Sequence, residues 1–275
     1  MRQSLKPNFK TNTSKLTHIP CFEQLPASPD LKMKSFDQPL PSPAENLAAD
    51  EALLDWCESG HGAETLRFWE PRETFVVVGY ANKIATEVNT TACATKKIPI
   101  FRRCSGGGTV VQMSGGLNYS LILRITEGGP LHNITSANHF IMEKNRAALS
   151  DLNQQFATGE ISVRGHTDLC LGHLKFAGNS QRRRKNFLLF HGTLLLDCDL
   201  KLISELLLMP SLEPDYRANR PHEEFVTNLP LPAGQVKAAL AAAWHADEIL
   251  ADPPLAAITA LAREKYSTRE WNFKF

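Results

Sequence analysis

The segment Arg102-Arg103-Cys104-Ser105-Gly106-Gly107-Gly108-Thr109-Val110-Val111 contains three consecutive glycines shortly after two arginines. Glycines leave backbone N–H groups uncovered, and the guanidinium groups of Arg102 and Arg103 add fixed positive charge at the entrance of the loop. A second segment, Lys175-Phe176-Ala177-Gly178-Asn179-Ser180-Gln181, provides a lysine that can act as a movable cation. Together the two segments predict a site that holds a carboxylate or a phosphate.

A simpler interpretation competes with such a site. Glycine runs also occur in ordinary turns and bulges, and a lone lysine is usually a solvated surface charge. The glycine loop is not a P-loop, because no Gly-Lys-Ser or Gly-Lys-Thr follows it, and no G-x-G-x-x-G opens a helix after a strand. Neither of the two common nucleotide-binding fingerprints therefore applies to this chain.

The composition is that of an ordinary globular protein. The 275 residues are 43% hydrophobic and 21% charged, which is enough for one large core or two small ones. Lys and Arg number 30 against 29 Asp and Glu, so no overall field favours nucleic acid or a membrane as a partner. The six cysteines form no Cys-x-x-Cys pair, and no apolar run approaches the roughly 20 residues of a membrane-spanning helix. These features predict a soluble, cytoplasmic protein.

The N-terminal residues 1–45 are rich in Lys, Ser, Thr and Pro and end in Pro39-Leu40-Pro41-Ser42-Pro43. Such a sequence resists helix and lacks sustained periodicity, so a mostly disordered arm is predicted over residues 1–42. A transit peptide is the alternative, although the arm contains few arginines. Met33 directly precedes the organised part and is an alternative start of translation.

The periodicity of the remaining chain predicts both helices and strands. Apolar residues at helical spacing predict a helix from about Pro43 to Ser59, with Asp and Glu in its early turns. Thr65–Glu70 and Thr74–Gly79 are predicted to pair as a hairpin around Pro71-Arg72-Glu73. The elements that follow are strands at 98–103, 109–113 and 118–124, a helix at 135–158, strands at 162–164, 168–171, 174–178 and 187–196, and helices at 199–208, 234–245 and 254–266. Strands bracketed by helices predict an α+β fold with a mixed, mainly antiparallel sheet.

Several segments, in this order, resemble the biotin/lipoate A/B protein ligase family, and in particular lipoate–protein ligase A. They are Asn46–Leu54, Leu66–Trp69 with Val76–Asn82, the glycine loop followed by Gly116–Ser120, Asp168-Leu169 with the lysine segment, His191-Gly192-Thr193, and Lys265–Phe273. The loop has none of the Gly-Arg-Gly-Arg pattern of biotin enzymes, which favours lipoate as the acid. The resemblance implies a class II aminoacyl-tRNA synthetase/biotin ligase-like catalytic domain over residues 43–275.

The resemblance also implies roles for the matching residues. Lys175 would be the catalytic residue, contacting the carbonyl of the acid and then the phosphate of an acyl-adenylate without forming a covalent bond. The residues implied in binding the substrate or the nucleotide are Arg102, Arg103, Ser105, Gly106, Gly107, Gly108, Asn118, Asp168, Gly178, Asn179, Ser180, His191 and Gly192. His191 is alternatively a core residue of an apolar strand, and Asn179 a turn residue. Asp168 would orient Lys175 or bind the nucleotide, directly or through Mg²⁺.

Two departures from the family pattern limit these expectations. Where many relatives carry His-Asp after the three glycines, this chain has Gln112-Met113, so no metal or proton-transfer role carries over to that position. The sequence stops at Phe275, directly after the closing motif, without the accessory C-terminal domain of longer lipoate ligases. We expect that activation proceeds without that domain, that a separate polypeptide supplies it, or that activation is lost.

Cys170 raises the alternative of a thioester intermediate, since the same fold class includes octanoyltransferases that use a cysteine thiolate. A nucleophilic thiolate requires a lowered pKa, and His166, His173 and Lys175 lie close to Cys170 in the sequence. Free cysteines are nevertheless most often small buried apolar residues, which is the competing interpretation for Cys170 and for Cys104. A zinc site made of His166, Cys170 and His173 is disfavoured, because residues so spaced on one strand point to alternating faces.

Three functions stay open at this point. The leading hypothesis is a lipoate–protein ligase that forms lipoyl-AMP from lipoate and ATP, with Mg²⁺, and passes the lipoyl group to a lysine of a lipoyl carrier domain. The second is an octanoyl or lipoyl transferase that takes its acyl group from an acyl carrier protein without ATP. The third is a lipoyl-binding module without turnover. The basic run Arg182–Lys185 is expected to be a solvated hairpin tip, which could steer an acidic carrier domain.

Overall fold

The computed structural model describes residues 33–154 and 159–275. Eight strands form a large sheet in the order β11-β1-β2-β6-β10-β9-β8-β7, and three form a small sheet in the order β4-β3-β5. The strands are β1 (Lys34–Asp37), β2 (Thr65–Trp69), β3 (Phe75–Val78), β4 (Ile100–Arg102), β5 (Val110–Gln112), β6 (Gly116–Arg124), β7 (Ile161–Arg164), β8 (Asp168–Leu171), β9 (Leu174–Arg183), β10 (Phe187–Leu195) and β11 (Glu248–Ile249). The helices are α1 (Pro43–Glu58), α2 (Ile84–Glu87), α3 (Thr90–Lys96), α4 (Ile134–Gln154), α5 (Lys201–Leu206), α6 (His222–Phe225), α7 (Ala233–Trp244), α8 (Leu255–Leu261) and α9 (Arg269–Asn272), with a 3₁₀ turn η1 (Asp215–Arg217) and a π-helical turn η2 (Ala262–Tyr266).

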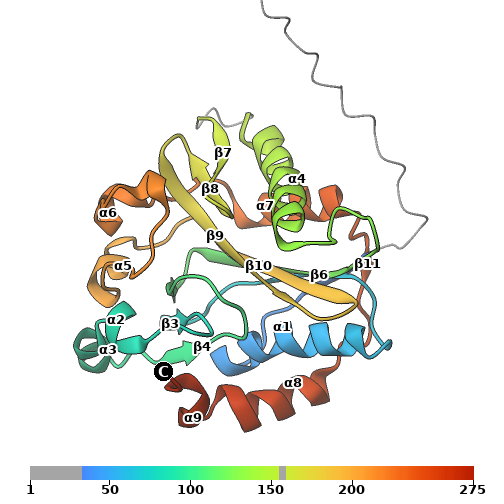
Figure 1. The fold of residues 1–275 in the computed structure, drawn as a ribbon, viewed down its shortest axis with the longest axis horizontal. Helices are drawn as coiled ribbons and strands as arrows, with labels where there is room; N and C mark the ends of the chain where they lie inside the picture. Colours follow the sequence, from blue (N-terminus) through green and yellow to red (C-terminus); the bar gives the residue numbers. More distant parts are fainter. Residues whose placement is uncertain (1–32, 155–158) are drawn as a thin grey trace, which may run out of the picture. The chain divides into compact units, whose positions relative to one another are not determined.

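Helices cover both faces of the large sheet (Figure 1). α4 and α7 lie against one face, in a core that contains Leu121 of β6 and Phe190 of β10. α1 lies against the other face and α8 packs on α1, in a core that contains Ile122 and Leu189 of the same two strands. Successive side chains of a strand point to opposite faces, so β6 and β10 supply apolar residues to both layers. This arrangement makes β10 a central, rigid strand.

The predicted α+β fold with a mixed, mainly antiparallel sheet is confirmed. The pairs β11–β1, β1–β2 and β3–β4 are parallel. The other strand pairs of the described residues are antiparallel. Hairpin-length turns connect β7 to β8, β8 to β9 and β9 to β10, as the sequence predicts.

Helix α1 begins where the sequence predicts a helix. The Oγ of Ser42 accepts the backbone N–H of Glu45 at 3.2 Å, and the Glu45 carboxylate accepts the N–H of Ser42 at 3.1 Å. Pro43 occupies the first turn, where its missing N–H removes no helical hydrogen bond. The later acids Asp50 and Glu51 are buried, so they do not serve the helix terminus as the sequence had suggested.

The predicted hairpin around Pro71-Arg72-Glu73 is wrong. β2 pairs with β1 and β6 in the large sheet, whereas β3 pairs with β4 and β5 in the small one. Every residue of β2 and β3 is buried, so neither strand has the alternating pattern of a strand with one exposed face. A turn signal predicts that the chain changes direction, but it does not choose the neighbours of strands that are buried on both faces.

Part of the predicted disordered arm is also wrong, because Lys34–Asp37 forms β1 between β11 and β2. Phe36 of this strand packs into the core on the α1 side of the sheet. A strand of four residues is too short to show a periodic pattern, and the partner strand Glu248–Ile249 comes from near the other end of the chain. Residues 1–32 of the predicted arm lie outside the described residues.

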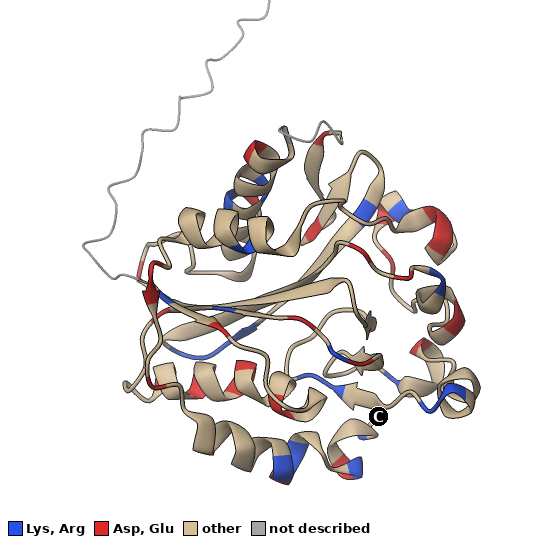
Figure 2. Ribbon diagram, turned by 180° about the vertical axis from the view of Figure 1, so that it is seen from behind, with Lys and Arg blue, Asp and Glu red and all other residues tan. Residues whose placement is uncertain are grey.

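Charged residues act through local pairs. Figure 2 shows acidic and basic positions interspersed along the helices, strands and loops. The basic run predicted as a solvated tip is partly used inside the protein: Arg182 Nη1 donates to the carbonyl oxygen of Cys104 at 2.7 Å, and Arg184 Nη2 lies 2.7 Å from the Asp55 carboxylate of α1. In residues 33–154 and 159–275, no helix is both long and apolar enough to span a membrane.

Candidate active site

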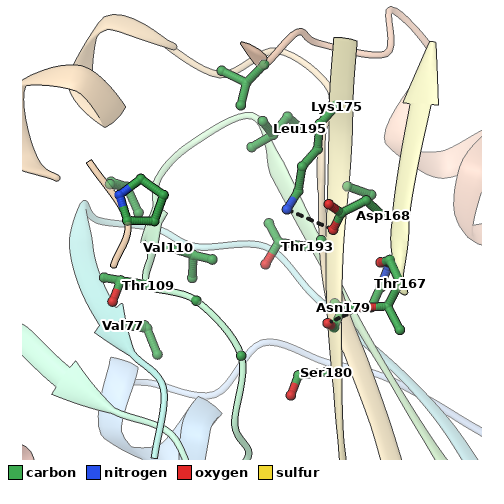
Figure 3. A pocket seen from close by; sticks show the side chains of 18 of the residues that line it. Val77, Thr109, Val110, Thr167, Asp168, Lys175, Asn179, Ser180, Thr193 and Leu195 are labelled. Atoms are coloured by element: carbon green, nitrogen blue, oxygen red, sulfur yellow. Dashed lines mark hydrogen bonds and ion pairs between the residues drawn. The ribbon is translucent and has the colours of Figure 1, made fainter. Parts of the chain in front are cut away.

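A cavity of about 980 Å³ lies between the small sheet and strands β8, β9 and β10 of the large one. Its described lining comes from the glycine loop with β5, the β8–β9 hairpin, β10 and residues 210–217. Figure 3 shows Asp168, Lys175, Asn179, Ser180 and Thr193 on one wall, and Val77, Thr109 and Val110 opposite them. The volume lies at the upper end of the usual range for small-molecule sites, about 300–1,000 Å³, so the cavity suits a ligand of cofactor size.

Lys175 extends its ammonium into this cavity from the start of β9 (Figure 3). Its Nζ lies 2.8 Å from Oδ1 of Asp168, and the hydroxyl of Tyr216 donates to Oδ2 of the same carboxylate at 2.8 Å. The Lys175 side chain is 28% exposed and the Asp168 side chain 13%. The carboxylate is therefore fixed from two sides, while the ammonium has room to move toward a ligand.

Gly178 makes room for that lysine. It lies opposite Asp168 in the β8–β9 pairing, and a Cβ at this position would lie 2.9 Å from Nζ of Lys175. The family resemblance implied that Gly178 takes part in binding the substrate or the nucleotide. In the structure, the space above Gly178 is used by the Lys175 side chain.

Arg103 is the fixed cation of the cavity. Its buried guanidinium donates to the carbonyl oxygens of Gly106 at 2.5 Å and Gly108 at 2.7 Å, and to Oγ of Ser105 at 3.1 Å. Gly107 takes a φ of +82°, which lets the carbonyl groups on either side of it turn toward the same guanidinium. Burial lowers the pKa of Arg103 to about 10, and no described carboxylate forms an ion pair with it. A buried cation without a counter-ion favours the binding of an anion.

Arg102 lies outside the described lining of the cavity. Its Nη1 donates to the carbonyl oxygens of Gly79, Tyr80 and Asn82 at 2.8, 3.1 and 2.8 Å. Its backbone N–H donates to Oδ1 of Asn272 at 2.9 Å. Successive residues of a strand point to opposite sides, so the two arginines of the motif have different surroundings. Arg102 fastens the C-terminal segment to β4, which is not the substrate-binding position that the sequence predicted.

His191 on β10 connects α1 to the glycine loop. Its Nδ1 lies 2.7 Å from Oδ2 of Asp50, and its Nε2 lies 2.5 Å from Oγ of Ser105. The other Asp50 oxygen accepts from Nη1 of Arg67 at 3.0 Å and from the hydroxyl of Ser120 at 2.7 Å. Burial opposes the charge of Asp50, but the hydrogen bond from His191, together with Arg67 and Ser120, outweighs it and lowers the pKa of the carboxyl. The structure therefore brings two predicted residues, His191 and Ser105, together with an ionised carboxylate.

Asn118 forms a closed polar pair with Gln112. Each amide donates to the oxygen of the other at 2.8 Å, and Thr193 Oγ1 donates to the Asn118 oxygen at 2.6 Å. All three residues line the cavity. Gln112 is the departure from the family pattern noted in the sequence, and its neutral amide is satisfied by Asn118 without a proton-transfer role.

Asn179 and Ser180 bind other parts of the protein. Asn179 accepts the hydroxyl of Tyr119 at 2.6 Å and donates to the carbonyl oxygen of Thr167 at 2.7 Å. A Cβ at the facing Gly192 would fall 1.7 Å from the Asn179 amide oxygen, so the two residues are packed in direct contact. The Ser180 hydroxyl donates to the carbonyl oxygen of Gly106 at 2.9 Å, which ties β9 to the glycine loop.

Neither cysteine considered in the sequence has the properties of a nucleophile. The Cys170 thiol is fully buried and donates to the Tyr216 hydroxyl at 3.6 Å, and burial raises its pKa. Burial also raises the pKa of Cys104 to about 12. A raised pKa keeps sulfur in the thiol form at neutral pH, whereas the thiolate is the reactive form. The described ranges contain no group of three or more His, Cys, Asp or Glu side chains that could hold a metal ion.

Two side chains of this site, Asp50 and Arg67, were missed in the sequence, and the role of a third, Tyr216, could not be assigned from it. An acid in a helix and a tyrosine in a loop look like surface residues, and only their approach in space reveals a role. Arg67 carried a usable signal, because it stands inside the apolar strand Leu66–Trp69, where a buried charge must find a partner.

Comparison with known proteins identifies the family of the chain. The model of the lipoyl protein ligase A/B catalytic domain matches residues 42–243. The octanoyltransferase LipM of Geobacillus kaustophilus is 27% identical over 263 residues, which cover 84% of this chain and 94% of that protein. The octanoyltransferase LipM of Carboxydothermus hydrogenoformans is 27% identical over 262 residues, which cover 85% and 96%.

Solved structures share the fold. A lipoate-protein ligase A bound with ATP is 25% identical, with a TM-score of 0.68 over 88% of this chain and 98% of that one. A bipartite lipoate protein ligase of Thermoplasma acidophilum, described with its E2 lipoyl domain, is 25% identical, with a TM-score of 0.68 over 88% and 96%. Because the family model matches most of the chain, the protein belongs to the family of lipoyl protein ligase A/B catalytic domains, as its motifs predicted.

Proposed function

We propose that this chain transfers an octanoyl or lipoyl group from an acyl carrier protein to a lysine of a lipoyl carrier domain, without ATP. The two sequence relatives reported above, each matched over more than nine tenths of its length, are octanoyltransferases by name, which supports an already activated acyl donor. The structural observation that carries the proposal is the Lys175 ammonium in the cavity, with its partner Asp168 at 2.8 Å. The ATP-dependent ligase favoured by the motifs becomes the second candidate.

The transfer needs no covalent bond to the enzyme. The neutral amine of the acceptor lysine attacks the thioester carbonyl, so that a C–N bond forms and the C–S bond breaks. The proton released by the amine goes to the departing thiolate. Negative charge builds up on the carbonyl oxygen during the attack, and a cation placed beside it lowers the barrier. Lys175 can supply this charge because its ammonium is partly exposed and can leave Asp168.

Arg103 and the opposite wall would hold the rest of the donor. The carrier protein presents its acyl group on an arm that contains a phosphate, and Arg103 is a buried cation without a carboxylate partner. Val77, Val110 and Leu195 line the cavity and offer apolar surface to the acyl chain. Charged and apolar side chains thus line the same cavity, as an acylated donor requires.

A thioester on Cys170 is not part of this proposal. The Cys170 thiol is fully buried, its pKa is raised, and it lies outside the described lining of the cavity. Direct attack by the acceptor amine avoids the need for an enzyme thiolate. We therefore propose a single displacement.

An ATP-dependent lipoate ligase is the second candidate because the fold is shared with a lipoate-protein ligase A bound with ATP, and the size of the cavity is compatible with it. About 980 Å³ accommodates an acyl-adenylate as well as an acylated arm. In that reaction Lys175 would contact the α-phosphate, and the acceptor amine would break the bond between the acyl carbon and the phosphate oxygen. Mg²⁺ would be bound chiefly by phosphate oxygens of the nucleotide, since the described residues offer no metal cluster of their own.

The proposed acceptor and location follow from the same family. A lipoyl carrier domain is the acceptor by analogy with the Thermoplasma ligase and its E2 lipoyl domain. We place the protein in the cytoplasm, where the five cysteines of the described residues, all free, would stay reduced. Residues 43–275 would form one catalytic domain. For the ligase reaction, a separate accessory polypeptide is proposed by analogy with the bipartite Thermoplasma ligase.

One experiment separates these functions. The full chain is incubated with a lipoyl carrier domain and either octanoyl-acyl carrier protein without ATP, or lipoate with ATP and Mg²⁺. Intact-mass spectrometry then reports acylation of the carrier domain. Acylation from the carrier protein supports the transferase, and acylation that depends on ATP, together with lipoate-dependent pyrophosphate exchange, supports the ligase. Binding of lipoate without acylation under either condition would leave only the non-catalytic module.

A further inference from the structure

We infer that Asp50, His191 and Ser105 form a positioning relay, which holds the glycine loop in the shape that receives the anionic part of the acyl donor; this role rests on the proposed function. The three residues come from α1, β10 and the loop after β4. The polar atoms lie 2.7 Å apart at the Asp50–His191 contact and 2.5 Å apart at the His191–Ser105 contact. Asp50 is 4% exposed and Ser105 1%, so water cannot replace these bonds at low cost.

The hydrogen bonds assign a direction to the relay. Ser105 Oγ accepts from Nε of Arg103 at 3.1 Å, and the described residues offer its proton no acceptor other than Nε2 of His191. Ser105 therefore donates to Nε2, and the ring proton of His191 lies on Nδ1 and points at Asp50. Asp50 fixes the orientation of the His191 ring, and the ring fixes the hydroxyl of Ser105. Ser105 in turn contacts the Arg103 guanidinium, which we propose binds the anionic part of the donor.

The far end of the relay is anchored. Asp50 is held by Arg67 at 3.0 Å and by Ser120 at 2.7 Å. Arg67 in turn donates to the backbone oxygen of Asn46 at 3.0 Å and to its side-chain oxygen at 2.7 Å. The anchor thus joins α1 to β2 and β6 in the rigid part of the fold, whereas Ser105 lies in a loop. A buried charged network adds little net stability compared with apolar packing, so its value here is in fixing the loop.

The same three residue types form the nucleophilic triad of many acyl hydrolases, but the surroundings of Ser105 argue against that role. Its hydroxyl is 1% exposed, lies outside the described lining of the cavity, and already contacts Arg103 and His191. The loop residues beside it, Gly107 and Gly108, do line the cavity. Ser105 therefore acts through the loop and not on the acyl carbon.

The test compares two buried serines that contact opposite ends of the relay. Ser105→Ala removes the contact with the loop, while Ser120→Ala removes a hydrogen bond to Asp50 and leaves the contact with the loop intact. We expect Ser105→Ala to raise KM for the acyl donor about threefold to tenfold with kcat nearly unchanged, the effect of one lost hydrogen bond. Ser120→Ala leaves Arg67 on the same Asp50 oxygen, so the relay keeps one anchor, and KM should rise less than in Ser105→Ala at equal or greater loss of thermal stability. Equal KM values in the two variants, or an acyl ester trapped on Ser105, would overturn the relay.

Amide hydrogen exchange gives a readout that does not depend on turnover. Ser105→Ala should speed exchange in residues 104–109 more than Ser120→Ala does, and unchanged exchange there would also overturn the relay. His191→Gln, whose longer amide can reach Ser105, should retain more protection of the loop than His191→Asn, whose shorter amide can reach only Asp50. If the wild type acylates no carrier domain from either donor, the proposed function fails, while the exchange comparison still decides whether the relay holds the loop.

Discussion

The two cations of the cavity are held in opposite ways. Arg103 is buried, bound to carbonyl oxygens of its own loop, and connected through Ser105 and His191 to helix α1. Lys175 is 28% exposed and, within residues 33–154 and 159–275, has one ion-pair partner, Asp168, on the neighbouring strand. A fixed charge suits the part of a substrate that stays in place, whereas a movable charge suits the atoms on which charge changes during the reaction.

The difference indicates that the two cations have separate functions, Arg103 in binding the donor and Lys175 in the chemical step. Removing a fixed charge should weaken binding of the donor before it affects the chemical step. Removing the movable charge should slow the chemical step more than it weakens binding. Each prediction below tests one side of this division.

Lys175→Ala should give the largest effect. Without the ammonium, charge on the carbonyl oxygen has no cation beside it, and kcat should fall about 10²- to 10³-fold. Since Lys175 is partly exposed, the melting temperature should change little. The initial rate of carrier-domain acylation measures the loss. Lys237→Ala is the matched control, because Lys237 is also a partly exposed lysine, ion-paired with Asp37 and Glu70, but lies outside the lining of the cavity. A Lys175→Ala rate close to that of the control would show that the movable charge takes no part in the chemistry.

Arg103→Met should raise KM for the acyl donor about 10- to 100-fold, as expected from losing a hydrogen-bonded charge worth about 1.5–3 kcal/mol. Arg102→Met removes a neighbouring buried arginine whose partners are also backbone carbonyl oxygens. Both variants should unfold at lower temperature, but only Arg103→Met should change KM. KM for the acyl donor is measured for both variants by steady-state kinetics, at a temperature below both melting temperatures. A matching rise of KM in Arg102→Met would mean that the effect comes from the fold and not from an anion at Arg103.

Gly178→Ala should have an intermediate effect. The added Cβ would lie 2.9 Å from Nζ of Lys175, so the ammonium must move while the strand keeps its bonds. Displacing the cation from its position should lower kcat about tenfold, with the free energy of unfolding changed by no more than about 1 kcal/mol. Gly234→Ala in α7 is the control, because a Cβ there meets nothing within 4 Å. Unchanged kcat in Gly178→Ala would show that Lys175 tolerates a range of positions.

The sequence predicted the elements with a long periodic pattern. Helices α1 and α7 and strand β10 lie close to their predicted bounds, because a single apolar stripe or alternation defines each of them. The predicted helix 135–158 matches α4 as far as Gln154, and its residues 155–158 lie outside the described residues. Strand β9 continues to Arg183, five residues beyond the predicted end at Gly178. Strand β1, of four residues, and strand β11, of two, were not predicted, because each is too short to show a pattern and the two strands pair with each other. The neighbours of β2 and β3 were also wrong, since strands buried on both faces carry no mark of which sheet they join.

The candidate site shows the same limit. Lys175, Arg103 and His191 stand in motifs that can be recognised along the chain, and the structure brings all three to one cavity. Asp50 and Tyr216 could not be assigned, because a carboxylate on a helix and a phenol in a loop gain their roles only from partners in distant segments. Arg102 shows the opposite case: it belongs to the motif, yet the alternation of side chains along the strand turns it away from the cavity.

Cys170→Ala should have the smallest effect on activity. This variant tests whether Cys170, near the Lys175 side of the cavity, acts as a nucleophile. The thiol lies behind Asp168, in contact with Tyr216 at 3.6 Å, and its raised pKa keeps it protonated. Removing one buried sulfur should lower the free energy of unfolding by about 1 kcal/mol and leave kcat within about twofold of the wild type. Wild type and variant are each mixed with octanoyl-acyl carrier protein, quenched in acid, and examined for an acyl adduct by intact mass. An adduct present in the wild type and absent in Cys170→Ala would replace direct transfer with a thioester route, and Lys175 would then serve the thiolate as well as the carbonyl.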